Sequence, residues 1–147
     1  MRDAFGGTFM IKLMLIFLTI YISFVAVALN YAKAFRVKNS IIDIIEQNEG
    51  IDDYTDNSRW SVIGHIDAYL EQVDYYVHLT NVSDRNNNSV HCYENGYCIE
   101  EFSVEGFDEL DKVYYKVTTY INIEMPFFGL NFPIAITGET RKIERIT

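Results

Sequence analysis

The chain has 147 residues, of which 49% are hydrophobic, and a net charge of −9. That length is enough for one modest domain but not for two. The charge is unevenly placed, because nine Lys or Arg stand against twenty Asp or Glu from residue 36 onward. So acidic a surface would repel nucleic acid, and we therefore exclude nucleic acid as a partner.

The N-terminal part contains a run of twenty uncharged residues over positions 13–32, LMLIFLTIYISFVAVALNYA. As a helix this run would be about 30 Å long, which matches the hydrocarbon core of a bilayer. Lys12 and Lys33 bracket it. We therefore predict a single-pass transmembrane helix over residues 13–35, preceded by a short tail or leader over residues 1–12.

Helical character continues beyond the apolar run. Between Gly7 and Gly50 there is neither Gly nor Pro, and apolar residues after Ala32 recur every three or four positions. We expect one helix to about residue 49, half in lipid and half projecting from it. Residues 50–147 are then expected to form an extracytoplasmic domain.

A cleaved secretory signal is the alternative to a permanent anchor. Ala26-Val27-Ala28 has the small-x-small form of a cleavage site, and Arg2 and Lys12 would supply the basic region before it. The unbroken helical pattern after Ala28 favours the anchor. Cleavage at Ala28 would instead release a secreted domain.

The orientation in the membrane is not fixed by charge alone, because basic residues lie on both sides of the apolar run. The short N-terminal tail and the two cysteines favour a C-terminal domain outside the cytoplasm. The predicted location is therefore the cell membrane, with one span.

The two cysteines flank a predicted hairpin. If residues 94–96 form a three-residue loop with Gly96 in the left-handed conformation, Tyr93 faces Tyr97 and Cys92 faces Cys98. Opposed cysteines on paired strands come close enough for a disulfide. Two reduced thiols are the alternative, and a two-residue turn at Asn95-Gly96 would break this register.

The rest of the domain combines a helix with strands. The helix is expected to begin with Ser58 as N-cap and to run to about Val73. Its apolar face would consist of Trp60, Ile63, Ile66, Leu70 and Val73. Strands are expected over residues 75–79, 90–93, 97–104, 112–125 and 132–136, with a turn over 126–131 and Gly138 as a candidate bulge. The predicted class is α+β, with a long N-terminal transmembrane helix, a second short helix and four or five antiparallel strands.

Motifs for enzymatic chemistry are missing from the sequence. It has no Gly-rich phosphate loop, no Gly-x-Ser-x-Gly elbow and no His-Glu-x-x-His. His91, Cys92 and Cys98 match no standard zinc spacing and lack a fourth ligand. We therefore predict a non-enzymatic protein without a catalytic site, cofactor or metal.

The N-terminal layout resembles that of type IV pilins and pseudopilins, and more closely that of the TadE-like subunits of Tad/Flp-type pili. Gly6-Gly7 precedes Thr8 and the apolar run, as a leader precedes the helix of those proteins. Residues 114–140 also resemble the C-terminal strands of TadE-like proteins. The resemblance implies leader cleavage between Gly7 and Thr8 and an α+β head carried on the helix.

Lys12 departs from the pilin pattern. Pilins typically carry Glu at the fifth position after the leader, where it neutralises the new amino terminus of a neighbour. Cleavage after Gly7 would place Lys12 there, and a cation cannot take that role. A minor or assembly-associated subunit therefore fits better than a major pilin.

The expected function is that of a membrane-anchored, pilin-like structural subunit in pilus or secretion-system assembly. Its partners would be the bilayer and other pilin-like subunits, in a homo- or hetero-oligomer. Residues expected in helix packing are Tyr21, Ser23, Ala26, Ala28 and Asn30. The alternative is a membrane-tethered binding or sensor module, with the exposed tyrosines of residues 112–125 as its ligand surface.

Overall fold

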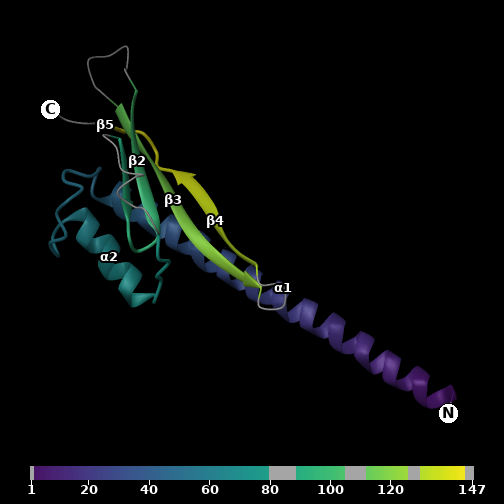
Figure 1. Cartoon of the computed structure of the whole chain (residues 1–147). Helices are drawn as coiled ribbons and strands as arrows, with labels where there is room; N and C mark the ends of the chain where they lie inside the picture. The colour runs from purple at the N-terminus through teal and green to yellow at the C-terminus, as the bar shows by residue number, and fades with distance from the viewer. Residues whose placement is uncertain (1, 80–88, 105–111, 126–129, 145–147) are drawn as a thin grey trace.

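A single long helix runs the length of the molecule (Figure 1). Helix α1 spans Arg2–Gln47, 46 residues without interruption, which confirms the single helix predicted from the absence of Gly and Pro. It begins earlier than expected, because residues 2–12, predicted as a tail or leader, continue the same helix. The computed structural model describes residues 2–79, 89–104, 112–125 and 130–144.

The described strands form one antiparallel sheet in the order β1-β2-β3-β4, with β5 paired to β3. Their bounds are Val90–Tyr93 for β1, Tyr97–Val104 for β2, Lys112–Met125 for β3, Leu130–Glu139 for β4 and Ile143–Glu144 for β5. The first three match the predicted strands to the residue, because a local pattern of alternating residues and the 94–96 loop define them. The α+β class is confirmed.

The last long strand differs from its prediction. β4 begins at Leu130, so Leu130 and Asn131 belong to a strand and not to the predicted turn, whose other residues lie outside the described part of the chain. Gly138 is not a bulge, since it pairs with Val117 in an unbroken register. A Cβ on Gly138 would lie 2.9 Å from side-chain carbons of Lys38 and Ile42, so this glycine lets α1 approach the sheet closely.

The predicted strand over residues 75–79 is wrong. These residues pair with no strand of the sheet, and a single backbone bond joins Val77 N–H to the carbonyl of Asn95. The segment is instead held by side chains, because the Tyr75 hydroxyl donates to the carbonyl of Tyr120. The alternating apolar residues of this segment therefore pack on the core without joining the sheet.

Helix α2 spans Val62–Gln72, which is shorter at its start than predicted. Its N-cap is Ser61 and not Ser58, because the Ser61 hydroxyl accepts from Gly64 N–H at 3.0 Å. Trp60 therefore precedes the helix and is 91% exposed, contrary to its predicted place on the apolar face. The other predicted positions on that face are confirmed as buried or half-buried.

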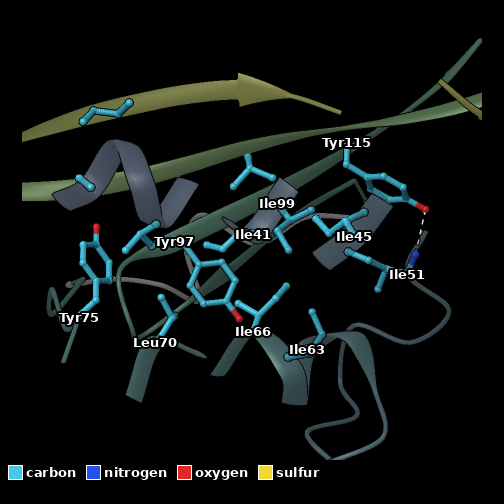
Figure 2. Close-up of a cluster of buried hydrophobic side chains, with 14 of the residues drawn as sticks. Ile41, Ile45, Ile51, Ile63, Ile66, Leu70, Tyr75, Tyr97, Ile99 and Tyr115 are labelled. Atoms are coloured by element: carbon cyan, nitrogen blue, oxygen red, sulfur yellow. Dashed lines mark hydrogen bonds between the residues drawn. The ribbon is translucent and has the colours of Figure 1, made fainter. Parts of the chain in front are cut away.

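The core lies between the sheet and the two helices. The inward positions of β3 are buried, and they pack with residues of α1 and α2 in one cluster. Figure 2 shows Tyr97 of β2 pointing toward α2, where its hydroxyl donates to Asp67 at 3.2 Å. Figure 2 also shows Tyr115 bound through its hydroxyl to the Ile51 N–H at 3.2 Å. Tyrosines thus supply both apolar volume and fixed polar links inside this small core.

Buried tyrosines make the fold sensitive to alkali. Burial raises the pKa of Tyr75 to about 12, and burial with nearby Asp67 raises those of Tyr93 and Tyr97 well above their ordinary value of 10.0. The folded chain therefore keeps protons that the unfolded chain loses above pH 10. Since the unfolded state then binds fewer protons, stability is unaffected below about pH 9 and falls as pH rises through 10 to 12.

We expect the free energy of unfolding in urea to be lower at pH 11 than at pH 8, by up to about 1.4 kcal/mol per pH unit for each such tyrosine. Tyr97→Phe removes one of these titrating groups, while Asn95 still donates to Asp67. The variant should therefore show a smaller fall between the two pH values. Equal stability of the unchanged chain at pH 8 and pH 11 would contradict the prediction.

Candidate membrane anchor and helix-packing surface

The N-terminal half of α1 stands free of the rest of the molecule (Figure 1). No side chain from Gly6 to Ala26 is buried, and Met14 and Phe24 are 70% and 71% exposed. In the described part of the chain, α1 is the one helix long and apolar enough to cross a membrane. So much exposed apolar surface requires either lipid or other apolar helices as its environment.

Two hydroxyl groups in the free part of α1 are bonded within the helix. Thr19 Oγ1 donates to the carbonyl of Ile16 at 2.8 Å, and Ser23 Oγ donates to the carbonyl of Thr19 at 2.9 Å. Such internal bonds allow hydroxyl side chains to lie in hydrocarbon without an unpaired donor. Thr19 and Ser23 therefore need no water as a hydrogen-bond acceptor.

The five residues predicted for helix packing fall on two faces of α1. Ser23, Ala26 and Asn30 are spaced by three and four positions and share one face. Tyr21 and Ala28 are seven apart and share another, about 200° round the helix from Ser23. All five lie on the surface, with Ser23 half-buried and the others exposed. Helix geometry therefore divides the predicted set into two separate surfaces.

The predicted cleavage position lies inside α1. Gly7 and Thr8 are exposed and helical, and a Cβ on Gly7 would meet nothing within 4 Å. Lys12 follows on the same exposed helix. The structure leaves this stretch accessible on all sides, and processing there stays a prediction.

The C-terminal half of α1 is part of the head. Contact with the core begins at Val27, which is half-buried. The stripe of α1 that faces the sheet consists of Ala34, Val37, Ile41 and Ile45, all buried. These residues recur every three or four positions, so one face of the helix packs continuously on β3 and β4. The free half of α1 and the head are therefore joined by one continuous helix.

Hydrogen bonds join the head to α1 at both ends of the part of the helix that packs on the sheet. Near the free part, Lys33 Nζ donates to the carbonyl of Asp74 at 2.6 Å. One residue further along α1, Thr119 Oγ1 donates to the carbonyl of Ala34 at 3.3 Å. At the far end, Glu46 accepts from the Arg141 N–H at 2.7 Å. Together with the buried stripe, these bonds fix the direction in which the helix leaves the head.

The cysteine hairpin has the predicted geometry. Cys92 pairs with Cys98 in the register of β1 and β2, with Cα atoms 4.0 Å apart, and the two form a disulfide. Gly96 closes the loop at a φ of 95°, the left-handed conformation that the loop requires. His91 stacks on the Tyr54 ring with centroids 3.9 Å apart. Among the described residues, no three His, Cys, Asp or Glu side chains are grouped so that they could hold a metal ion.

The outer face of the sheet carries the tyrosines named for the alternative function. Tyr114 is half-buried and stacks on Phe102 with centroids 5.0 Å apart. Next to this pair, Lys116 Nζ lies 3.8 Å from a Glu100 carboxylate oxygen. This face is therefore mixed, with one aromatic pair beside an ion pair.

Sequence reasoning missed the residues that join the head to the helix. Thr119 interrupts the apolar inner face of β3 with a hydroxyl, and Gly138 leaves a gap opposite Lys38. Both irregularities are visible in the sequence, since they break an otherwise apolar pattern. Their partner could not be identified, because it lies about 85 or 100 positions away on α1.

Comparison of the chain with protein-family models, with characterised proteins and with solved structures finds no match.

Proposed function

We propose that the chain is a membrane-anchored, pilin-like structural subunit of the TadE-like kind, acting in pilus or secretion-system assembly. The observation that carries the proposal is the division of α1. Its free half is apolar and exposed, while its other half forms part of the core of the head. A subunit built in this way transmits the position of its membrane helix rigidly to its head.

Location and chemistry support the proposal further. The disulfide between Cys92 and Cys98 suits an oxidising compartment, so the head would lie outside the cytoplasm. The tyrosine hydroxyls that the core uses are bound to backbone or carboxylate groups, as in structural links. We therefore propose a non-enzymatic, structural role for the head.

The face of α1 with Tyr21 and Ala28 is the proposed contact to neighbouring apolar helices, because the face with Ser23, Ala26 and Asn30 continues the stripe that packs on the head. A small side chain such as that of Ala28 lets helix backbones approach closely. The opposite face, with Ser23 and Ala26, would then face lipid below the head.

Co-purification tests this proposal. The full chain, tagged at its C-terminus and extracted in mild detergent, should recover other single-pass subunits or further copies of itself. Ala28→Leu should reduce that recovery several-fold, because it fills the close contact, whereas Ala26→Leu on the opposite face should leave it unchanged. Recovery of the chain as an isolated monomer would contradict the proposal. An equal loss of partner recovery in both variants would contradict the assignment of the contact to this face.

The N-terminus of the mature protein separates the proposal from its rivals. A start at Met1 or Thr8 keeps the whole apolar helix and agrees with an anchored subunit, unprocessed or processed. A start at Leu29 would indicate the secreted alternative. That cut would also remove Val27, the first residue of α1 that packs on the head.

A membrane-tethered binding or sensor module is the second candidate. The stacked pair of Phe102 and Tyr114 on the outer sheet face favours it, since partly accessible stacked rings bind flat or apolar ligands. It predicts a ligand that raises the melting temperature of the head, together with no recovered partner subunits. Those two results would replace the leading proposal.

A further inference from the structure

The free part of α1 is a little longer than the bilayer it would have to cross. Residues 2–26 would span about 37 Å at 1.5 Å per residue, against about 30 Å for a hydrocarbon core. Contact between α1 and the head begins at Val27, directly after this stretch. If the bilayer ends where the head begins, it covers residues 6–26, and no helical spacer separates the two.

The sheet extends down α1 toward the free half (Figure 1). Asn122 of β3 borders the same hollow, of about 280 Å³, as Asn30 and Lys33 of α1, so it lies beside Asn30 along the helix axis. β3 continues three residues further to Met125, which corresponds to about 10 Å of strand or about seven residues of helix. The paired ends of β3 and β4 therefore lie beside the part of α1 near Ser23.

The side chains at this end suit the headgroup layer. Among the residues whose side chains the structure describes, its exposed aromatic residues are Tyr31, Phe35 and Tyr76. Aromatic side chains of this kind are enriched where hydrocarbon meets water. Lys33 and Arg36 are exposed there as well, and α1 carries no acidic residue between Asp3 and Asp43. Within an acidic protein, this stretch of helix offers only cations, which would pair with lipid phosphate. Asp74 of the head borders the same hollow, and its carbonyl accepts from Lys33, so Arg36 is the cation further from that carboxylate along the helix.

We infer that this end of the head is a lipid-contact surface lying in the headgroup layer, with phospholipid phosphate groups as the partners of Lys33 and Arg36. Asn122 and its cross-strand partner Pro133, both exposed, mark the surface on the sheet. The inference rests on the proposed anchoring by α1. It gives the bilayer a second role, which is to hold the head in one orientation above the membrane.

The lipid-contact surface also implies different limits for the membrane-spanning segment than the sequence predicted. Residues 27–35, predicted to lie in lipid, belong to the head, since Ala34 is fully buried under the sheet. The bilayer would cover residues 6–26 instead. Lys12 would then lie about 9 Å inside the N-terminal boundary, and its ammonium would reach back to the headgroups along its aliphatic stem.

Single-tryptophan variants test the inference. The chain has one Trp, and Trp60→Phe provides a background without it. Asn122→Trp reports on the proposed surface, and Pro133→Trp reports on the same place from β4. The matched control is Tyr114→Trp, on the same strand and the same face but eight residues, or about 26 Å, further from the bilayer. Phe17→Trp reports on the free half of α1.

The full-length variants are reconstituted in vesicles of phosphatidylethanolamine and phosphatidylglycerol that contain nitroxide-labelled lipid. Headgroup nitroxide should quench the Trp in Asn122→Trp and in Pro133→Trp at least about threefold more than the Trp in Tyr114→Trp, since the control lies beyond the headgroup layer. Nitroxide near the chain ends should quench the Trp in Phe17→Trp strongly.

Two different results would overturn the inference, and they are distinguishable. If the Trp in Phe17→Trp is not quenched, the anchor itself fails, and the proposed function and the lipid-contact surface fail with it. If that Trp is quenched but neither sheet reporter exceeds Tyr114→Trp, the anchor stands and the lipid-contact surface is wrong. The second result would place this end of the head beyond the headgroup layer.

Discussion

A fragment of residues 50–147 is expected to remain unfolded, whereas a fragment of residues 27–147 should fold and unfold cooperatively in urea. The shorter fragment lacks the buried stripe of α1, to which Val37, Ile41 and Ile45 each contribute a fully or almost fully buried side chain. Burial of a Val or Ile side chain contributes about 1.5–3 kcal/mol. Three of them supply about 5–9 kcal/mol, which equals the whole stability of many small domains.

Point variants in the longer fragment provide the matched control. Ile41→Asp places a carboxylate in the middle of the stripe and should abolish the cooperative transition seen by circular dichroism. Asn39→Asp adds the same charge two positions away at an exposed site and should leave the transition within about 0.5 kcal/mol. A cooperative transition in residues 50–147, or in the Ile41→Asp variant, would show that α1 is dispensable for the head.

This expectation changes the N-terminal boundary of the folded domain. The sequence suggested a boundary near residue 50, where the polar stretch Asp52–Asn57 begins. The structure instead places the C-terminal half of α1 inside the core, so the folding unit begins near Val27. A helix pattern read along the chain shows where apolar residues recur, but it does not show whether lipid or a sheet covers them.

Local patterns predicted the strands whose ends are set by local chemistry. β1 and β2 follow from the Glu94–Gly96 loop, which fixes the pairing of Cys92 with Cys98 through its own geometry. β3 follows from fourteen residues of strict alternation, with Thr118 and Tyr120 outward and Val117 inward. These features depend on neighbours within a few positions, so the sequence contains them.

Features that depend on distant partners were missed or wrong. Residues 75–79 alternate between apolar and polar side chains as a strand does. The sheet has the order β1-β2-β3-β4, and the segment pairs with none of these strands. β5 has two residues, which is too short to show a pattern. Ser58 and Ser61 are both good N-caps, and only the position of the chain before α2 decides between them. In each case long-range packing overrides the local preference.

The candidate site was predicted in outline but not in position. The free apolar helix and the disulfide follow from composition and spacing, and both are present. The division of the packing residues into two faces needed only helix geometry, which the sequence already implies. The head-side limit of the free helix could not be found in this way, because Val27 and Leu29 have the same apolar character whether lipid or protein covers them.

Gly64→Ala is expected to destabilise the head by about 2 kcal/mol or more, although helix propensity predicts the opposite sign. In an open helix, replacing Gly with Ala would stabilise by about 1 kcal/mol. Here a Cβ on residue 64 would lie 1.8 Å from the Ser58 carbonyl oxygen and 2.7 Å from its carbon. That carbonyl cannot easily move away, because it accepts from both the N–H and the hydroxyl of Ser61, the N-cap of α2.

Ala68→Gly, at an exposed position one turn further along α2, isolates the effect of propensity. It should cost about 1 kcal/mol in urea unfolding. Gly64→Ala and Ala68→Gly should therefore both destabilise the head, whereas helix propensity alone predicts opposite signs for the two. The clash at Gly64 outweighs the propensity gain because forcing extra atoms into a packed contact costs about 1–3 kcal/mol, and here backbone must move as well. If Gly64→Ala stabilised the protein, the chain before α2 would not fold over the helix, and Ser61 would lose its two bonds to the Ser58 carbonyl.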